Sequence, residues 1–291
     1  MQVQFGIQNF FTSVEVKSGN ARTKKFANDS RNNYLILSRC QMLNHNGSIY
    51  LFNGQECLTL EQGSWKHHST SNAMNALVVS TDIGIFMFHL FHYINGFSYE
   101  YLLNGQRTWN YPDVNDSMPG SFRQGSAIYV KSKQEIWLIG GLHTEQRIFT
   151  FNIKSFTFEE LPLKLNIGRF GHRCEIIPGT SKIMITGGQT FDLVTQCSTE
   201  ILDPETLSIT IASPMNRRRS EHGMSVVTIN DEDRLAVFGG FEGNFSDLRC
   251  FELYNTQTKK WELTKEISLR KGKRGFGYIS VKNELISKYL N

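Results

Sequence analysis

The hydrophobic pattern of the chain is that of many short strands. Apolar runs such as "RLAVFGG" (234–240), "CFELYN" (250–255) and "KWEL" (260–263) alternate with polar residues or are rich in β-branched and aromatic side chains. Each run stops at residues typical of turns, and no segment of useful length has a helical period. The pattern therefore predicts an all-β protein.

A Gly-Gly pair ends three of the apolar runs, and the first glycines of these pairs lie 47 and 52 residues apart. A second apolar run precedes each pair. A polar loop, a third run, a turn and a fourth run follow it. The unit is therefore predicted to contain four short antiparallel strands. The paired glycines are Gly140, Gly141, Gly187, Gly188, Gly239 and Gly240.

Large apolar residues recur at the fourth strand of each unit, in steps of 44, 49, 51 and 52 residues. The first two steps fall in a part of the chain where the glycine pairs are incomplete. The run "SIYLFNG" (48–54) ends in a single glycine, and "GIFMFHLF" (84–91) has no glycine at its end. The recurrence still extends over most of the chain. The residues are Trp65, Trp109, Phe158, Ile209 and Trp261.

Four-stranded sheets repeated radially form a β-propeller. The chain resembles the kelch-repeat family in the residues quoted above, namely an apolar strand that ends in Gly-Gly and, further on, the spaced Tyr254 and Trp261. The resemblance is fullest over 123–271 and partial over 34–122. We expect both kinds of residue to be structural: glycine permits positive φ and close backbone approach, and tryptophan fills the wedge between diverging blades.

The spacing of arginines predicts how the ring closes. Counting from Arg274 places the next glycine pair at the end of the chain, so the last unit lacks two strands, which the N-terminal segments "VQFGI" and "SVEV" can supply. We expect one domain over 1–291, a six-bladed kelch-type β-propeller with four antiparallel strands per blade and a last blade closed by both termini. The alternative is that the chain is part of a larger protein. The expected blades are 31–70, 71–122, 123–168, 169–218, 219–273, and 274–291 together with 1–30.

The loops that follow the glycine pairs and the segments that lead into each first strand must open on one face of such a propeller, here called the loop face. Arginines hold acidic peptide motifs on this face in kelch receptors, and the resemblance implies the same possibility here. The structural alternative is that each arginine anchors its own loop to carbonyl groups. The predicted partner-binding residues are Arg123, Arg169, Arg219, Arg274, His143, Phe191, Phe241 and Asn244.

Composition limits the choice of function classes. The net charge of +4 is too mild to indicate a nucleic-acid binder, and 40% apolar residues are ordinary for a globular protein. The five dispersed cysteines indicate reduced thiols. The N-terminus lacks the pattern of a signal peptide, and the longest apolar run, 83–94, is too short to cross a membrane. We therefore expect a cytoplasmic protein, and we expect it to be a monomer.

No motif for catalysis stands out. His89 and His92 are three residues apart, and His67 and His68 are adjacent, so in strands each pair points to opposite faces. We expect no catalytic residues, no metal and no cofactor. The expected function is a protein-interaction module that docks an acidic partner peptide, in substrate recognition for ubiquitin ligases or in cytoskeletal scaffolding. The alternatives are a propeller hydrolase or oxidase, or a binder of anions or nucleic acid.

Overall fold

The structure is a computed structural model of the 291-residue chain. It describes residues 2–7, 10–17, 20–25, 41–52, 56–61, 64–70, 76–89, 98–111, 122–229, 231–243, 246–269, 272 and 274–281. All regular elements in these residues are β-strands, as the hydrophobic pattern predicts. No helix among them is long and apolar enough to cross a membrane.

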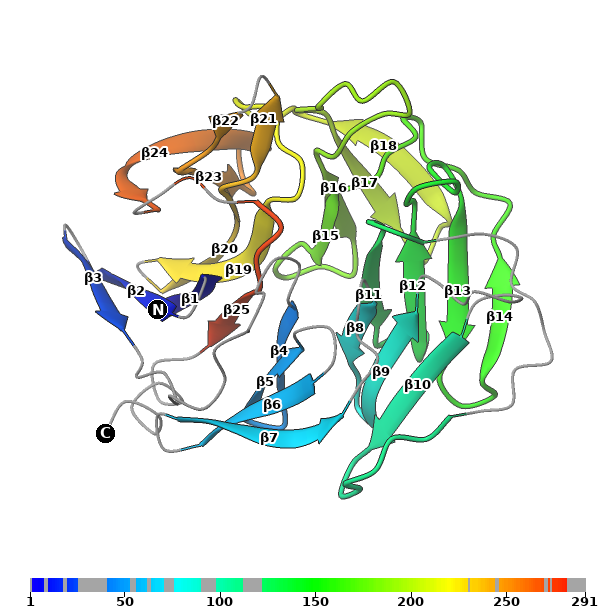
Figure 1. Ribbon diagram of the computed structural model, residues 1–291. Coiled ribbons are helices and arrows are strands. Elements are labelled where there is room, and N and C mark those ends of the chain that lie inside the picture. Colours follow the sequence, from blue (N-terminus) through cyan, green and yellow to red (C-terminus); the bar gives the residue numbers. More distant parts are fainter. Residues whose placement is uncertain are drawn as a thin grey trace.

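The sheets are arranged radially as a β-propeller (Figure 1). The described residues form five four-stranded blades, not six, because the remaining sheet of the ring, β10-β9-β8, has three strands. The prediction of a propeller is confirmed. The prediction of six four-stranded blades is wrong, because the sheet β10-β9-β8 has three strands where four were expected. Among the described residues that follow β10, Asn110 pairs with the sheet through an isolated bridge to Tyr101, and no fourth strand forms.

Three consecutive blades between residues 126 and 268 follow the predicted up-and-down order. In each of them the first strand is innermost and the fourth is outermost. A two-stranded hairpin, β21 (Phe241–Gly243) with β22 (Ser246–Asp247), is inserted in the last of them. The blades are β11 (Ser126–Val130), β12 (Glu135–Ile139), β13 (Ile148–Asn152) and β14 (Thr157–Glu160); β15 (Arg173–Ile176), β16 (Ile183–Thr186), β17 (Thr199–Asp203) and β18 (Ser208–Ala212); and β19 (Gly223–Ile229), β20 (Glu232–Phe238), β23 (Cys250–Asn255) and β24 (Lys260–Ser268).

Three sheets come from the first half of the chain and the C-terminal strand. One of them joins the two ends of the chain: β25 pairs with β1 in antiparallel register, with Gln4 opposite Ile279. This confirms that both ends of the chain share one sheet. The expected division into two strands from each end is wrong, because three described strands come from the N-terminal segment and one comes from the C-terminal segment, and "ELISKYL" (284–290) lies outside the described residues. The sheets are β4 (Gln41–His45), β5 (Ser48–Phe52), β6 (Glu56–Glu61) and β7 (Ser64–Thr70); β8 (Leu77–Ser80), β9 (Gly84–His89) and β10 (Ser98–Leu103); and β25 (Tyr278–Val281), β1 (Gln2–Ile7), β2 (Phe10–Lys17) and β3 (Asn20–Lys25).

The innermost strands contact one another in a closed circle. β4 contacts β8, β8 contacts β11, β11 contacts β15, β15 contacts β19, β19 contacts β25, and β25 contacts β4. Because the first strands make these contacts, each sheet extends outward from the centre of the ring (Figure 1).

The hydrophobic core is divided into layers between neighbouring sheets. Trp109 packs edge-on against Phe52 of the preceding sheet, with ring centroids 6.0 Å apart. Trp261 packs on Tyr254 at 5.2 Å and shares a buried cluster with Met184 of the neighbouring blade. These contacts confirm the predicted wedge role for Trp109 and Trp261. The side chain of Trp65, which lies in β7, is outside the described residues.

The glycine pairs also have the predicted role. All six glycines have positive φ, as in Gly140 (57°) and Gly141 (109°). A Cβ on Gly140 would lie 2.7 Å from the carbonyl oxygen of Arg169, which belongs to the segment leading into the next blade. A side chain would therefore both strain the backbone and push neighbouring blades apart.

Candidate functional site: the loop face and the central channel

The four predicted arginines do not occupy one position of the repeat. Arg123, Phe170 and Ser220 each form the same isolated bridge to the residue that follows a glycine pair. Backbone bonds from Gly171 N to Gln124 O (2.6 Å) and from Gly275 N to Glu221 O (2.9 Å) extend the equivalence to Arg274. Arg169 and Arg219 therefore stand one position earlier than Arg123 and Arg274.

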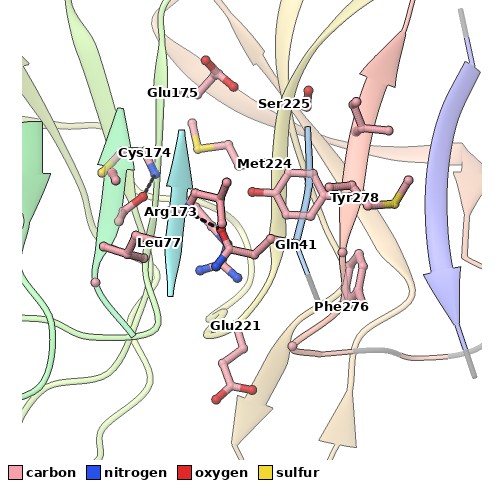
Figure 2. Close-up of a pocket in the computed structure, with 18 of the residues that line it drawn as sticks. Gln41, Leu77, Arg173, Cys174, Glu175, Glu221, Met224, Ser225, Phe276 and Tyr278 are labelled. Carbon is pink, nitrogen blue, oxygen red and sulfur yellow. Dashed lines mark hydrogen bonds between the residues drawn. The ribbon is translucent and has the colours of Figure 1, made fainter. Parts of the chain in front are cut away.

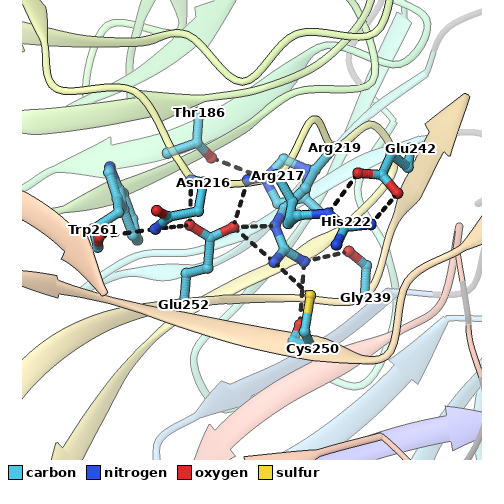
Figure 3. A network of polar contacts seen from close by, with 10 residues as sticks. All are labelled: Thr186, Asn216, Arg217, Arg219, His222, Gly239, Glu242, Cys250, Glu252 and Trp261. Atoms are coloured by element: carbon cyan, nitrogen blue, oxygen red, sulfur yellow. Dashed lines mark hydrogen bonds and ion pairs between the residues drawn. The ribbon is translucent and has the colours of Figure 1, made fainter. Parts of the chain in front are cut away.

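Arg219 is fully buried and holds its own blade together (Figure 3). Its guanidinium donates to Glu252 Oε1 from Nη2 at 2.8 Å and from Nε at 3.2 Å, and to Gly239 O from Nη1 at 2.8 Å. Glu252, also 0% exposed, accepts further bonds from Asn216 N (2.5 Å), Asn216 Nδ2 (2.9 Å) and Arg217 N (3.1 Å). Every charge in this network has its partner inside the protein.

Arg169 repeats the network in the preceding blade. Its Nη2 donates to Glu200 Oε1 at 2.7 Å, and its Nη1 donates to Gly187 O at 2.8 Å and Ser198 O at 3.1 Å. Burial lowers the pKa of Arg169, and the Glu200 carboxylate opposes that effect. Asn166 N and Nδ2 donate to Glu200 Oε2, as Asn216 does to Glu252.

The blade β11–β14 has two aromatic rings in place of this ion pair. Phe122 stands at the position of Arg169 and Arg219, and it packs edge-on against Phe149 with ring centroids 4.9 Å apart. Both are buried, at 0% and 1% exposure. The repeat therefore tolerates either a buried ion pair or an apolar pair at this point.

The backbone of the same arginines links neighbouring blades. Gly141 N donates to Arg169 O at 3.0 Å, and Gly188 N donates to Arg219 O at 2.7 Å. The glycine pair of one blade is thus bonded to the arginine segment of the next. The predicted partner-binding role of Arg169 and Arg219 is therefore wrong: their side chains are buried in structural networks, and no docked peptide could reach them.

The remaining predicted residues have different surroundings. Arg274 is half exposed, lies over the ring of Phe241 at 4.5 Å, and is 3.5 Å from Asp247. Arg123 is only partly exposed. Asn244 lies outside the described residues. Of the four arginines predicted for the rim, only Arg274, beside the β21–β22 hairpin, is exposed, and Arg123 is partly exposed.

One of the predicted loops after a glycine pair exposes large apolar side chains in the part of the loop face that the structure describes. It joins β16 to β17 and presents Phe191 (74% exposed), Leu193 (68%) and Val194 (46%). Phe191 and Thr190 line an open cleft of about 450 Å³ with His143 and Lys164. The structure thus brings together two of the predicted partner-binding residues, His143 and Phe191. The sequence analysis names Phe191 but not Leu193 and Val194, which the apolar run "FDLV" (191–194) could have indicated.

The central channel is the second candidate site. A cavity of about 380 Å³ is lined by residues of the innermost strands, among them Gln41, Arg173, Glu175 and Tyr278 (Figure 2). Glu221 also lines the cavity and accepts a bond from Gln124 Nε2 at 2.7 Å. Burial raises the pKa of Glu175 to about 7.

The described residues contain no group of three or more His, Cys, Asp or Glu side chains that could hold a metal ion. Four of the cysteines lie in this part of the chain, and all four are free thiols. Burial raises the pKa of Cys57 and of Cys174 to about 12, so neither is a thiolate at neutral pH.

No protein-family model matches the chain, and no curated protein matches it either.

Proposed function

We propose that this protein is a kelch-type propeller that acts as a non-enzymatic protein-interaction module and docks its partner on the loop face. Support for the kelch type comes from the positive φ of the glycine pairs and from the packing of Tyr254 on Trp261. Roles in substrate recognition for a ubiquitin ligase or in cytoskeletal scaffolding remain part of this proposal.

The exposed loop 190–194 carries the proposal. Monomeric proteins seldom place several large apolar side chains together in water unless something covers them. Burying one such side chain contributes about 1.5–3 kcal/mol, so Phe191 and Leu193 together could supply most of the energy of a micromolar interaction. The adjoining cleft offers a pocket for an apolar side chain of the partner.

The charges around the loop indicate the rest of the partner. Lys164 lines the cleft, and Arg218 is exposed on the connection between β18 and β19. Neither cation forms an ion pair within the part of the chain that the structure describes. Glu145 and Asp192 line the same cleft, and Glu145 accepts a bond from His143 N. The proposed partner is therefore a protein segment with a large apolar residue for the cleft and acidic residues that pair with Lys164 and Arg218.

A peptide-display selection on the purified chain tests the proposal. We expect enrichment of peptides with an aromatic or aliphatic residue next to Asp or Glu. Phe191→Ser combined with Leu193→Ser should weaken binding of an enriched peptide about 100-fold, which corresponds to about 2.7 kcal/mol. Ile211→Ser is the matched control, because Ile211 is 75% exposed but lies on the outermost strand β18.

Two results would overturn the proposal. One is a selection that enriches no peptide. The other is an enriched peptide that binds the double loop variant as tightly as it binds the wild type and the Ile211→Ser control.

A further inference from the structure

The central channel has the dimensions and the lining of a small-molecule site. Its volume of about 380 Å³ lies within the range of ligand pockets. Its walls come from the innermost strands of all the sheets in the ring, so the closed circle of blades fixes its shape. This site is separate from the docking loop. Binding of a ligand in the channel is therefore independent of the proposed function.

Arg173 is a cation in the channel without an acidic partner. It is at the start of β15, and its Nη1 donates to the carbonyl oxygen of His172 at 3.0 Å. No ion pair joins it to any described carboxylate, in contrast to Arg169 and Arg219. Figure 2 shows its guanidinium inside the channel beside Gln41.

Tyr278 projects into the channel from β25, which is separated from β15 in the ring by β19 (Figure 2). Burial raises the pKa of its hydroxyl, and the charge of Arg173 opposes part of that rise. Tyr278 is therefore neutral at physiological pH. Its hydroxyl can donate a hydrogen bond to an anionic group held at Arg173.

Glu175 supplies the opposite charge two residues further along β15. Its Oε1 accepts a bond from the adjacent Ile176 N at 3.1 Å, and it forms no ion pair with a described cation. Figure 2 shows its carboxyl group directed away from Arg173. Two charges of opposite sign thus face the same channel without neutralising each other.

Arg173 and Glu175 are both partly exposed, so water in the channel can solvate them and a ligand that displaces this water must supply groups of opposite charge. A plain carboxylate would compensate Arg173, but it would be repelled by Glu175 and Glu221, which line the same channel. A ligand with both a carboxylate and an ammonium group complements the whole lining. Residues two apart on a strand are separated by about 6.6 Å, which a linear chain of about three to five methylene groups can span.

We propose that the central channel binds a small amino carboxylate, with its carboxylate on the Arg173 guanidinium and the Tyr278 hydroxyl and its ammonium group at Glu175.

Titration calorimetry at pH 8 with 4-aminobutyrate, 5-aminopentanoate and 6-aminohexanoate tests this site. Pentanoate and pentylamine are the probes that carry only one of the two charges. We expect saturable binding of at least one amino carboxylate, at least tenfold tighter than binding of either single-charge probe.

Variants assign the two ends of the ligand. Arg173→Gln should weaken amino carboxylate binding at least tenfold. Glu175→Gln should abolish the preference for the amino carboxylate over pentanoate. This second variant still tests the proposal if Arg173→Gln does not fold. Arg218→Gln, which changes an exposed arginine outside the channel, should bind as the wild type does.

The inference is overturned if none of the three amino carboxylates binds saturably at millimolar concentration. It is also overturned if binding survives unchanged in Glu175→Gln, or in a folded Arg173→Gln. None of these results bears on peptide docking at loop 190–194.

Discussion

Replacing Arg219 by alanine should destabilise the fold severely, although the sequence pattern places this residue on a binding rim. The substitution removes the cation from Glu252, which is 0% exposed, and leaves Gly239 O and Cys250 O without their donor at Arg219 Nη1. Removing one member of a buried ion pair costs about 3–5 kcal/mol.

The three other donors to Glu252, from Asn216 and Arg217, remain in the variant and favour the lower part of this range. A change of 1 kcal/mol shifts the melting temperature of a domain somewhat smaller than this one by about 2–4 °C. We therefore expect a loss of about 3 kcal/mol and a fall in melting temperature of roughly 6–12 °C.

Thermal and urea unfolding followed by circular dichroism measure this loss. Arg218→Ala is the matched control, since the neighbouring side chain is exposed and its removal should change stability by less than about 0.5 kcal/mol. If Arg219→Ala unfolds at the same temperature as Arg218→Ala, the buried network does not stabilise the blade and the structural interpretation of these arginines fails.

Three further changes test the fold. Gly187→Ala should cost more stability than Gly179→Ala in urea unfolding, because both have positive φ but only Gly187 faces the carbonyl oxygen of the next blade; equal losses would contradict the close-approach argument. Stability should fall from pH 7.5 to 5, because burial and nearby arginines lower the pKa of His222; a His222→Gln variant should show a shallower fall, and an equal slope would refute this cause. Gln4→Cys with Ile279→Cys should form a disulfide on oxidation, since these residues are opposite each other in β1 and β25; free thiols after oxidation would contradict the closure.

The sign of the pH effect follows from linkage. The folded pKa of His222 lies well below its ordinary value of 6.5, so its contribution to stability is present above pH 6.5 and is lost as the pH falls. Glu175 acts in the opposite direction, because its folded pKa is raised to about 7 and its contribution is lost as the pH rises. The comparison is therefore made in a Glu175→Gln background, which removes the opposing titration.

The parts of the fold that could be predicted from the sequence are those that repeat. The glycine pairs at 140, 187 and 239 identify the ends of the second strands, because both the positive φ and the approach of the next blade require glycine. Tyr254 and Trp261 likewise mark the interface between blades. The sharing of one sheet by both ends of the chain followed from counting along the repeat, but the direct pairing of β1 with β25 did not.

The arginines could not be assigned correctly because sequence spacing does not show what a side chain contacts. Arg169 and Arg219 differ from Arg274 by one position in the repeat, and that one position separates a buried ion pair from an exposed cation. The decisive partners, Glu200 and Glu252, lie on the third strand of each blade, far along the chain. The segments "NIGRFGH" (166–172) and "NRRRSEH" (216–222) share Asn, Arg and His at equal spacing, which is the signal for this network.

The channel could not be predicted for a related reason. Arg173, Glu175 and Tyr278 come from two innermost strands that are far apart in the sequence, and only closure of the ring brings them to one cavity. The sequence also could not show that the sheet β10-β9-β8 has three strands. Trp109 stands at the spacing expected for a fourth strand and is packed in the core, although no fourth strand forms among the described residues there.

Hydrogen–deuterium exchange with a display-selected peptide bound tests the central claim, docking on the loop face, most directly. The loops after the glycine pairs lie on one face, and the turns between third and fourth strands, 153–156, 204–207 and 256–259, lie on the other. We expect the peptide to slow exchange at 189–196 and 142–147 and to leave those turns unchanged. Slowed exchange at 153–156, 204–207 or 256–259, with none at 189–196, would contradict the account.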